Sequence, residues 1–224
     1  MSDQMLVTAA RLLGDGEVCV AGCGPARRAA RLARATHAPG LTVLGDDGTV
    51  DGVPAATAGA AEFAAYWLQG GRVDVGLLAA DQVDAFGNVN TTVLGEYDEP
   101  TARLSGAGAA AEIATGAGRV VVLLPHRLSA FVERVDFVTA PGALTGPLDR
   151  AQVGLRGAGP VAVVTDLGVL RPDPATAELV LTEVHPGVSV DRVRAETGWP
   201  LEVADEVGVT APPTAAEVAA LRAG

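Results

Sequence analysis

Short apolar runs alternate with helical segments over the first two-thirds of the chain, and this alternation constrains the fold more than any other feature. Val18–Ala21, Leu41–Leu44 and Val73–Ala79 each have the length and composition of a buried strand. A helix that Pro25 opens and that runs to about Thr36 separates the first two. Because strands separated by helices pair in parallel, we predict an α/β fold with an open, mostly parallel, doubly wound sheet.

The remaining apolar runs extend this predicted sheet toward the C-terminus. Arg119–Leu124 and Val135–Thr139 are interpreted as two further strands. Pro160–Thr165 and Glu178–Val184 are interpreted as a strand pair, which adds mixed strands near the C-terminus. No internal repeat or clear domain boundary interrupts the sequence, so residues 1–224 are interpreted as a single domain. Further helices are predicted at residues 3–14, 60–69, 190–197 and 214–222, the last with a capping box of Thr214 and Glu217.

The charge balance excludes several classes of function. The formal net charge is −11, and all 16 basic residues are arginines. Without lysine the chain provides neither a Schiff base nor a lysine-dependent phosphate-binding loop. An acidic chain also lacks the positive surface of a nucleic-acid-binding protein. Arginines 27, 28, 31 and 34 recur at near-helical spacing, which favours a solvated face or a subunit contact over a phosphate site.

Hydropathy indicates a protein that folds around its own core, away from membranes. The sequence is 49% hydrophobic but only 4% aromatic, so the core must consist mainly of Ala, Val and Leu. No apolar run approaches the roughly 20 residues of a membrane span. The N-terminal stretch lacks the basic start and apolar centre of a signal peptide. We therefore expect a cytoplasmic location.

No metal site is expected. Cys19 and Cys23 are the only cysteines, and they lack the second pair or the histidines of a structural zinc site. In a strand they would share one face, which predicts that both are buried apolar residues. The three histidines have no metal-ligand spacing, and His126 is interpreted as a structural histidine.

The stretch Leu41–Gly48, LTVLGDDG, is the first candidate for a functional turn. A buried strand that stops on Gly-Asp-Asp-Gly would place carboxylates at the sheet edge where open α/β sheets bind ligands. Asp and Gly also form ordinary Asx-type turns at strand ends. From the pattern alone, both interpretations of Asp46 and Asp47 stay open.

Two later segments have compositions typical of functional loops. Residues 80–95 are dense in hydrogen-bonding side chains around Gly87. Gly106-Ala107-Gly108 precedes an alanine-rich helix, and backbone amides at such a start can hold an anion or a developing oxyanion. A packing turn of small residues explains the same pattern.

Five stretches, in order along most of the chain, form a specific combination. They are HAPGLTVLGDDG (37–48), QVDAFGNVNTTVLGEYDEPTARLSGAG (82–108), VERVDFVTAPG (132–142), VVTDLGVL (163–170) and HPGV (185–188). Together they resemble the beta subunit of family I CoA-transferases, especially the glutaconate CoA-transferase type. The resemblance implies an α/β open sheet of the CoA-transferase type, a partner alpha subunit in a heterodimer or heterotetramer, and coenzyme A as a thioester substrate with no metal.

The resemblance also assigns roles to individual residues. In the family a glutamate of the beta subunit forms a glutamyl-CoA thioester, and Asp46 stands at that position. Aspartate keeps the charge but is shorter by one methylene, and a misplacement of about 1 Å can cost about 100-fold in rate. The family loop usually reads Gly-Ser-Gly-Gly-Ala, and its second adjacent glycine is replaced here by Ala109. Gly106, Ala107 and Gly108 are the predicted oxyanion or CoA-contacting loop.

Gln82, Asn88 and Asn90 are the predicted substrate-orienting residues, although the asparagines equally suit a purely local role in the loop. Related branches of the superfamily, which include ring-cleaving hydrolases and a glutaconyl-CoA decarboxylase-like pair, bind acyl-CoA without transferring CoA. Three functions therefore stay open. The first is CoA transfer with Asp46 as the nucleophile. The second is hydrolysis, carbon–carbon cleavage or decarboxylation with Asp46 as a base or a bystander. The third is a mainly structural role beside a catalytic alpha subunit.

Overall fold

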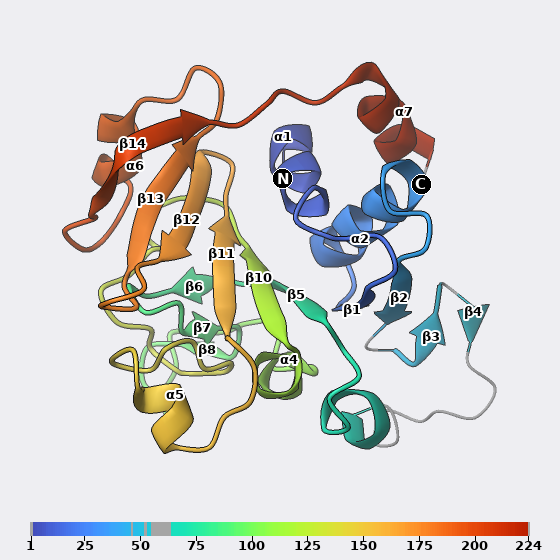
Figure 1. Cartoon of the computed structure of the whole chain (residues 1–224). Coiled ribbons are helices and arrows are strands. Elements are labelled where there is room, and N and C mark those ends of the chain that lie inside the picture. Colours follow the sequence, from blue (N-terminus) through green and yellow to red (C-terminus); the bar gives the residue numbers. More distant parts are fainter. Residues whose placement is uncertain (1, 46, 52, 55–63, 224) are drawn as a thin grey trace.

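The computed structural model describes residues 2–45, 47–51, 53–54 and 64–223, and it has helices on both faces of one central sheet (Figure 1). Ten described strands form this sheet in the order β14-β13-β12-β11-β10-β5-β1-β2-β3-β4. Its five central strands are parallel, which confirms the predicted open, mostly parallel sheet. These strands are β11 (Pro160–Val164), β10 (Arg119–Leu123), β5 (Val75–Ala79), β1 (Val18–Ala21) and β2 (Thr42–Gly45).

Antiparallel pairs extend the sheet at both edges. Beyond β11, strands β12 (Gly168–Pro172) and β13 (Leu179–Val184) are antiparallel, and β14 (Val203–Val209) returns parallel to β13. Beyond β2, the short strands β3 (Thr49–Val50) and β4 (Val53–Pro54) form an antiparallel ribbon. The polar segment after β5 adds two small hairpins, formed by β6 (Gln82–Val83) with β7 (Val89–Asn90) and by β8 (Val93–Leu94) with β9 (Ala102–Arg103).

The two faces of the sheet have separate cores. Cys19 and Ala21 of β1 lie in the core that contains α1 and α2, whereas Val20 lies in the core that contains α4. This alternation follows from the two-residue period of a strand. Most core residues are Ala, Val and Leu, as the low aromatic content predicts. The helices are α1 (Asp3–Ala10), α2 (Pro25–Thr36), the π-helix η1 (Ala64–Leu68), α4 (Ala110–Gly116), α5 (Asp149–Gln152), α6 (Val190–Ala195) and α7 (Ala215–Ala223).

Two glycines allow α4 to lie close to its neighbours. A β-carbon at Gly76 of β5 would collide with the side chain of Ile113, and one at Gly116 would collide with Leu68 of η1. Because these positions lack side chains, α4 packs directly on the backbone of β5. This contact fixes the start of α4 near the carboxyl end of β5.

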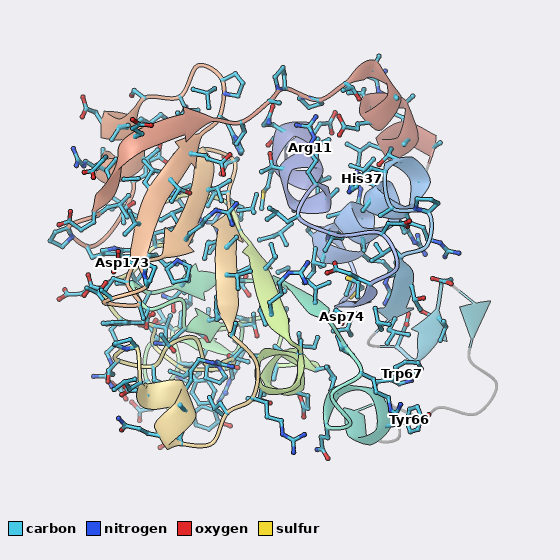
Figure 2. The ribbon with its side chains drawn as sticks, in the orientation of Figure 1. Arg11, His37, Tyr66, Trp67, Asp74 and Asp173 are labelled. Carbon is cyan, nitrogen blue, oxygen red and sulfur yellow. The ribbon has the colours of Figure 1, made fainter. Side chains whose placement is uncertain are left out.

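The predicted capping box of the last helix is confirmed. The Thr214 amide donates to Glu217 Oε2 at 2.7 Å, and the Glu217 amide donates to Thr214 Oγ1 at 3.2 Å. Arg11, labelled in Figure 2 beside α1, also donates through Nε to Glu217 Oε1 at 2.8 Å. Arg11 and Thr214 hold the pKa of the Glu217 carboxyl at about 2. One carboxylate thus closes α7 and joins it to α1.

The predicted strand at Val135–Thr139 is wrong. The amides of Thr139 and Ala140 both donate to the single carbonyl of Val89, at 2.9 and 3.1 Å. A strand ladder would require these amides to bond successive residues of a partner strand. The segment instead crosses the β6–β7 hairpin with bends at Asp136 and Phe137.

The predicted pairing of 160–165 with 178–184 is also wrong, because a further strand lies between them. β12 pairs antiparallel with β11 on one side and with β13 on the other. The glycine and the proline of β12 stand at its ends, and Val169 and Leu170 between them are buried. Strand β14 was not predicted at all.

Between β2 and β5, the structure agrees only in part with the elements predicted from the sequence. The residues after Gly48 contain the short strands β3 and β4, which the sequence did not predict. The helix predicted at residues 60–69 falls partly outside the described residues. Its described part is the π-helix η1.

Candidate active site

The strand order reverses between β1 and β5. From β1 the chain passes through α2 to β2 on one side of β1, and it later returns to β5 on the other side (Figure 1). At such a switch point the connections after the two strands leave in opposite directions, and a crevice forms at the carboxyl ends. This geometry makes the ends of β1 and β5 the expected ligand site.

A cavity of about 190 Å³ lies at this switch point. Residues after β1, the carboxyl half of β5, the loop before α4 and one residue after β7 meet there. The lining is mainly small or aliphatic and includes no basic residue. Its members are Gly22, Cys23, Leu77, Leu78, Ala79, Thr91, Ser105, Gly106, Ala107, Gly108, Ala109, Ala110 and Ile113.

The predicted loop Gly106–Gly108 forms one wall of this cavity. Gly106 and Gly108 have φ values of +93° and +50°, a region that favours glycine. The Gly106 amide donates to the carbonyl of Thr91 at 2.8 Å, which fixes the loop. Within the described part of the chain, the amides of Ala107 and Gly108 have no hydrogen-bond acceptor. The wall can therefore offer backbone donors to a negatively charged oxygen.

Asp46, the predicted nucleophile, lies outside the described residues, and Gly45 is the last described residue before it. Gly45 ends β2, is buried, and is in register with Ala21, the last residue of β1. Ala21 directly precedes Gly22 and Cys23 in the cavity wall. The carboxyl end of β2 therefore lies at the same edge of the sheet as the cavity, one strand away from it.

Asp47, the neighbour of Asp46 in the sequence, has a local structural role. Its Oδ1 accepts from the amide and the hydroxyl of Thr49 at 3.1 and 2.7 Å. Its Oδ2 accepts from Arg27 at 2.7 Å. These donors, with Arg27 the largest cause, lower the pKa of Asp47 below its usual range. Asp47 is thus a turn residue whose two oxygens are already engaged.

The arginine cluster of α2 partly faces the turn after β2. Besides the Arg27–Asp47 pair, Arg34 lies 2.7 Å from Asp51, whose carboxylate also accepts from the Val43 amide at 2.9 Å. These ion pairs hold the β2–β3 connection against α2. Two members of the predicted solvated face therefore position the candidate turn instead.

Asn88 is buried and links two loops. Its Nδ2 donates to Asp84 Oδ2 at 2.9 Å and to the Leu144 carbonyl at 2.8 Å. Its Oδ1 accepts from the amides of Gly142 and Leu144 at 2.8 and 3.2 Å. Burial raises the pKa of Asp84, although the donors from Asn88 oppose this. These contacts correspond to the local role that the sequence left open, and contact of Asn88 with substrate stays a prediction.

Asn90 and Gln82 form a second buried network, in the β6–β7 hairpin. Asn90 Nδ2 donates to Gln82 Oε1 at 2.7 Å and to the Val93 carbonyl at 2.6 Å. Asn90 Oδ1 accepts from the Thr92 amide at 2.9 Å. Gln82 Nε2 donates to Asp136 Oδ2 at 3.3 Å. The network shapes the turn at residues 90–93, next to the cavity, so an orienting role for Gln82 and Asn90 would be indirect.

The cysteine prediction is correct for Cys19 and wrong for Cys23. Cys19 is fully buried, and burial strongly raises the pKa of its thiol. Cys23 is exposed and lines the cavity. The strand ends at Ala21, so the two-residue alternation that would bury Cys23 does not reach it.

His126 is a structural histidine, as predicted, within a polar cluster that the sequence did not reveal. Its ring stacks on Phe131 with centroids 3.7 Å apart, and Nε2 lies 2.9 Å from Thr197 Oγ1. Burial lowers the pKa of His126 to about 4. His185 is also buried, with Nδ1 2.7 Å from Thr210 Oγ1 and Nε2 2.8 Å from the Thr165 carbonyl. Because the partners come from distant segments, no local pattern could have predicted them.

The described parts of the chain contain neither a candidate metal site nor a candidate membrane span. No group of three or more His, Cys, Asp or Glu residues there could hold a metal ion. No helix there is long and apolar enough to cross a membrane.

Comparison with known proteins agrees with the geometry. A family model described as coenzyme A transferase matches residues 53–196, more than half of the chain. This chain belongs to the coenzyme A transferase family. A 3-oxoadipate CoA-transferase subunit from Pseudomonas knackmussii is 43% identical over 99% of this chain and 92% of its own length.

Solved structures of two relatives share the fold of this coenzyme A transferase family member. Glutaconate coenzyme A-transferase from Acidaminococcus fermentans has a TM-score of 0.89 and 27% identity over 99% of this chain and 94% of that chain. The decarboxylase AibA/AibB has a TM-score of 0.82 and 28% identity over 99% of this chain and 92% of that chain. The predicted kinship with both transferases and decarboxylases is confirmed.

Proposed function

We propose that this chain is the beta subunit of a CoA-transferase that acts on an acyl-CoA thioester, with Asp46 as the nucleophile. The observation that carries the proposal is the register of Gly45 with Ala21 beside the switch-point cavity. This register places the carboxyl end of β2 at the sheet edge where the Gly106–Gly108 wall offers backbone amides. Acyl transfer requires a carboxylate nucleophile and oxyanion donors, and Asp46, which follows Gly45 in the sequence, would supply the nucleophile.

The proposed reaction consists of two exchanges at the Asp46 carboxylate. One carboxylate oxygen attacks the thioester carbonyl carbon, and the C–S bond breaks to give an acyl–aspartyl anhydride and CoA thiolate. The thiolate attacks the aspartyl carbonyl, which releases the first acid and leaves an aspartyl-CoA thioester. An acceptor carboxylate then repeats the two steps in reverse, so CoA moves to the second acid. The amides of Ala107 and Gly108 would stabilise the tetrahedral oxyanions.

Asp47 cannot replace Asp46 in this role. Its two oxygens accept from Arg27 and Thr49, and its lowered pKa makes it a weaker nucleophile. Asp47 and Arg27 instead hold the β2–β3 connection against α2. Because aspartate is shorter than glutamate by one methylene, the acyl carbon must come closer to the backbone than it would with a glutamate nucleophile.

An alpha subunit would complete the site. The 43% identical relative is named as one subunit of its transferase, and the structural relative AibA/AibB is named as a pair. The Gly106–Gly108 wall is exposed in the isolated chain. A covering partner would exclude water, which would otherwise hydrolyse the anhydride and the thioester.

CoA exchange measured in the complex of this chain with its alpha subunit tests the proposal. Labelled acid should enter 3-oxoadipyl-CoA or glutaconyl-CoA, the thioesters of the acids named in the relatives. Asp46→Asn should abolish exchange, because an amide is not a nucleophile here. Asp47→Asn is the matched control at the neighbouring carboxylate, and because its amide oxygen can still accept from Thr49, it should retain most of the exchange. Equal activity of Asp46→Asn and the unmodified complex would contradict the proposal.

A second candidate function is decarboxylation or hydrolysis of an acyl-CoA on the same scaffold. The likeness to the decarboxylase AibA/AibB favours it, since the fold extends over 99% of this chain. In that case Asp46 would act as a general base or would not react. Thioester hydrolysis or CO₂ release that survives Asp46→Asn, without exchange into acids, would select this function. Loss of all turnover in an assembled Asp46→Ala complex would count against a purely structural role.

A further inference from the structure

Thr91 is one of the residues that line the switch-point cavity, and its buried hydroxyl has no hydrogen-bond partner among the described residues. The residue is 5% exposed, and its Oγ1 has no partner in the described structure. Buried polar atoms are nearly always paired, because an unpaired one loses its hydration without compensation. The unpaired hydroxyl therefore lowers the stability of the folded chain at the candidate ligand site.

The backbone of Thr91 is held firmly, in contrast to its free hydroxyl. Its amide donates to Thr139 Oγ1 at 3.0 Å, and its carbonyl accepts from the Gly106 amide at 2.8 Å. Asn90 fixes the same turn by accepting from the Thr92 amide. Thr91 is thus tied to the wall that the proposed function assigns to the oxyanion. This arrangement pre-organises the hydroxyl without engaging it.

The lining of the cavity indicates which ligand group would pair with this hydroxyl. Most lining residues are aliphatic or glycine, and none is basic, so a carboxylate would have no counter-charge among them. A carbonyl oxygen is neutral and accepts hydrogen bonds. We propose that Thr91 is a substrate-binding residue whose hydroxyl donates to a carbonyl oxygen of the acyl-CoA.

This inference rests on the proposed function, because it takes acyl-CoA as the ligand. The carbonyl could belong to the thioester itself or to a 3-oxo group along the acyl chain. A hydroxyl that pairs with the ground-state carbonyl mainly lowers KM, whereas one that pairs with the developing oxyanion raises kcat. A pair of acyl-CoAs with and without the 3-oxo group separates the two sources.

The test compares Thr91→Val with Thr91→Ser in the complex with the alpha subunit. Valine keeps the shape and removes the hydroxyl, and serine keeps the hydroxyl. For 3-oxoadipyl-CoA we expect Thr91→Val to weaken kcat/KM about 10-fold, the loss of one buried hydrogen bond, and Thr91→Ser to restore most of it. Adipyl-CoA should show the same loss if the partner is the thioester carbonyl and no loss if it is the 3-oxo group.

The melting temperature Tm of Thr91→Val distinguishes a substrate-binding role from a structural role, because loss of a structural hydrogen bond would lower Tm. Because the hydroxyl is unpaired, Thr91→Val should leave Tm unchanged or raise it. Thr210→Val is the matched control, since Thr210 is 6% exposed and its Oγ1 lies 2.7 Å from His185 Nδ1. This control should lower Tm and leave kcat/KM unchanged.

Two results would overturn the inference, and a third would remove its basis. Unchanged kinetics of Thr91→Val with both acyl-CoAs would show that the hydroxyl meets no substrate. A lower Tm of Thr91→Val with a matching loss in Thr91→Ser would show a structural role. If the unmodified complex neither binds nor turns over acyl-CoA, the proposed function itself fails, and this inference fails with it.

Discussion

The buried histidine His126 predicts a specific loss of stability in acid. His126 is 3% exposed, and its ring stacks on Phe131 and lies against Thr197. Burial lowers the pKa of His126 from 6.5 to about 4, because the charged ring would lose its hydration. Between these two values the unfolded chain binds the proton and the folded chain does not. The free energy of unfolding must therefore fall as the pH falls from about 6.5 to about 4.

The size of this effect follows from the two pKa values. A difference from 6.5 to about 4 corresponds to about 3 kcal/mol, at about 1.4 kcal/mol for each tenfold change in affinity. The effect is complete only near pH 4, so about half of it should be present at pH 5. Since domain stabilities are about 5–15 kcal/mol, the loss should be readily measured.

Urea denaturation followed by circular dichroism at several pH values between 7.5 and 4 measures this contribution. His126→Gln retains a polar side chain but does not titrate, so its stability should change less with pH by up to about 3 kcal/mol. His37→Gln is the control at an exposed histidine, and it tests whether the change is specific to His126. Parallel curves for His126→Gln and the unmodified chain over this range would refute the reasoning.

Two further variants test the packing that positions the site. Gly76→Ala places a methyl group against Ile113 and should destabilise the chain by about 1–3 kcal/mol in denaturant melts. Gly146→Ala, which meets only Asp149 at 4.0 Å, should have little effect, and equal losses would contradict the contact of α4 with β5. Thr214→Ala removes the α7 cap and should cost about 1 kcal/mol, and an unchanged melting curve would show that the capping box contributes nothing.

The sequence predicted those parts of the fold that local pattern determines. Val18–Ala21 and the helix Pro25–Thr36 lie where the apolar run and the proline indicated, because their boundaries are set by adjacent glycines. Strand β14 was missed because its residues are mostly half-buried or exposed, so they have no apolar pattern. It is a strand only because β13 provides a parallel edge. Val135–Thr139 shows the converse, an apolar pattern without a partner strand.

The segments that form the candidate site could be predicted from the sequence, but the contacts of individual side chains within it could not. The family resemblance indicated the turn after β2 and the Gly106–Gly108 loop, and the switch point brings that loop to the cavity. The amides of Asn88 and Asn90 are occupied by loop contacts that no sequence pattern reveals. Thr91 and Cys23 line the cavity only through the tertiary structure, because the sequence pattern predicted Cys23 on a buried strand face and did not single out Thr91.

The covalent intermediate on Asp46 is the most direct test of the central claim. The complex with the alpha subunit is incubated with acyl-CoA and then treated with borohydride, which reduces an aspartyl thioester to the alcohol and converts Asp46 to homoserine. Cleavage at arginine releases residues 35–72, and fragmentation of this peptide by mass spectrometry distinguishes Asp46 from Asp47. We predict reduction at Asp46 that depends on acyl-CoA and is absent in Asp46→Asn. Turnover with CoA exchange but without modification at Asp46 would contradict the account.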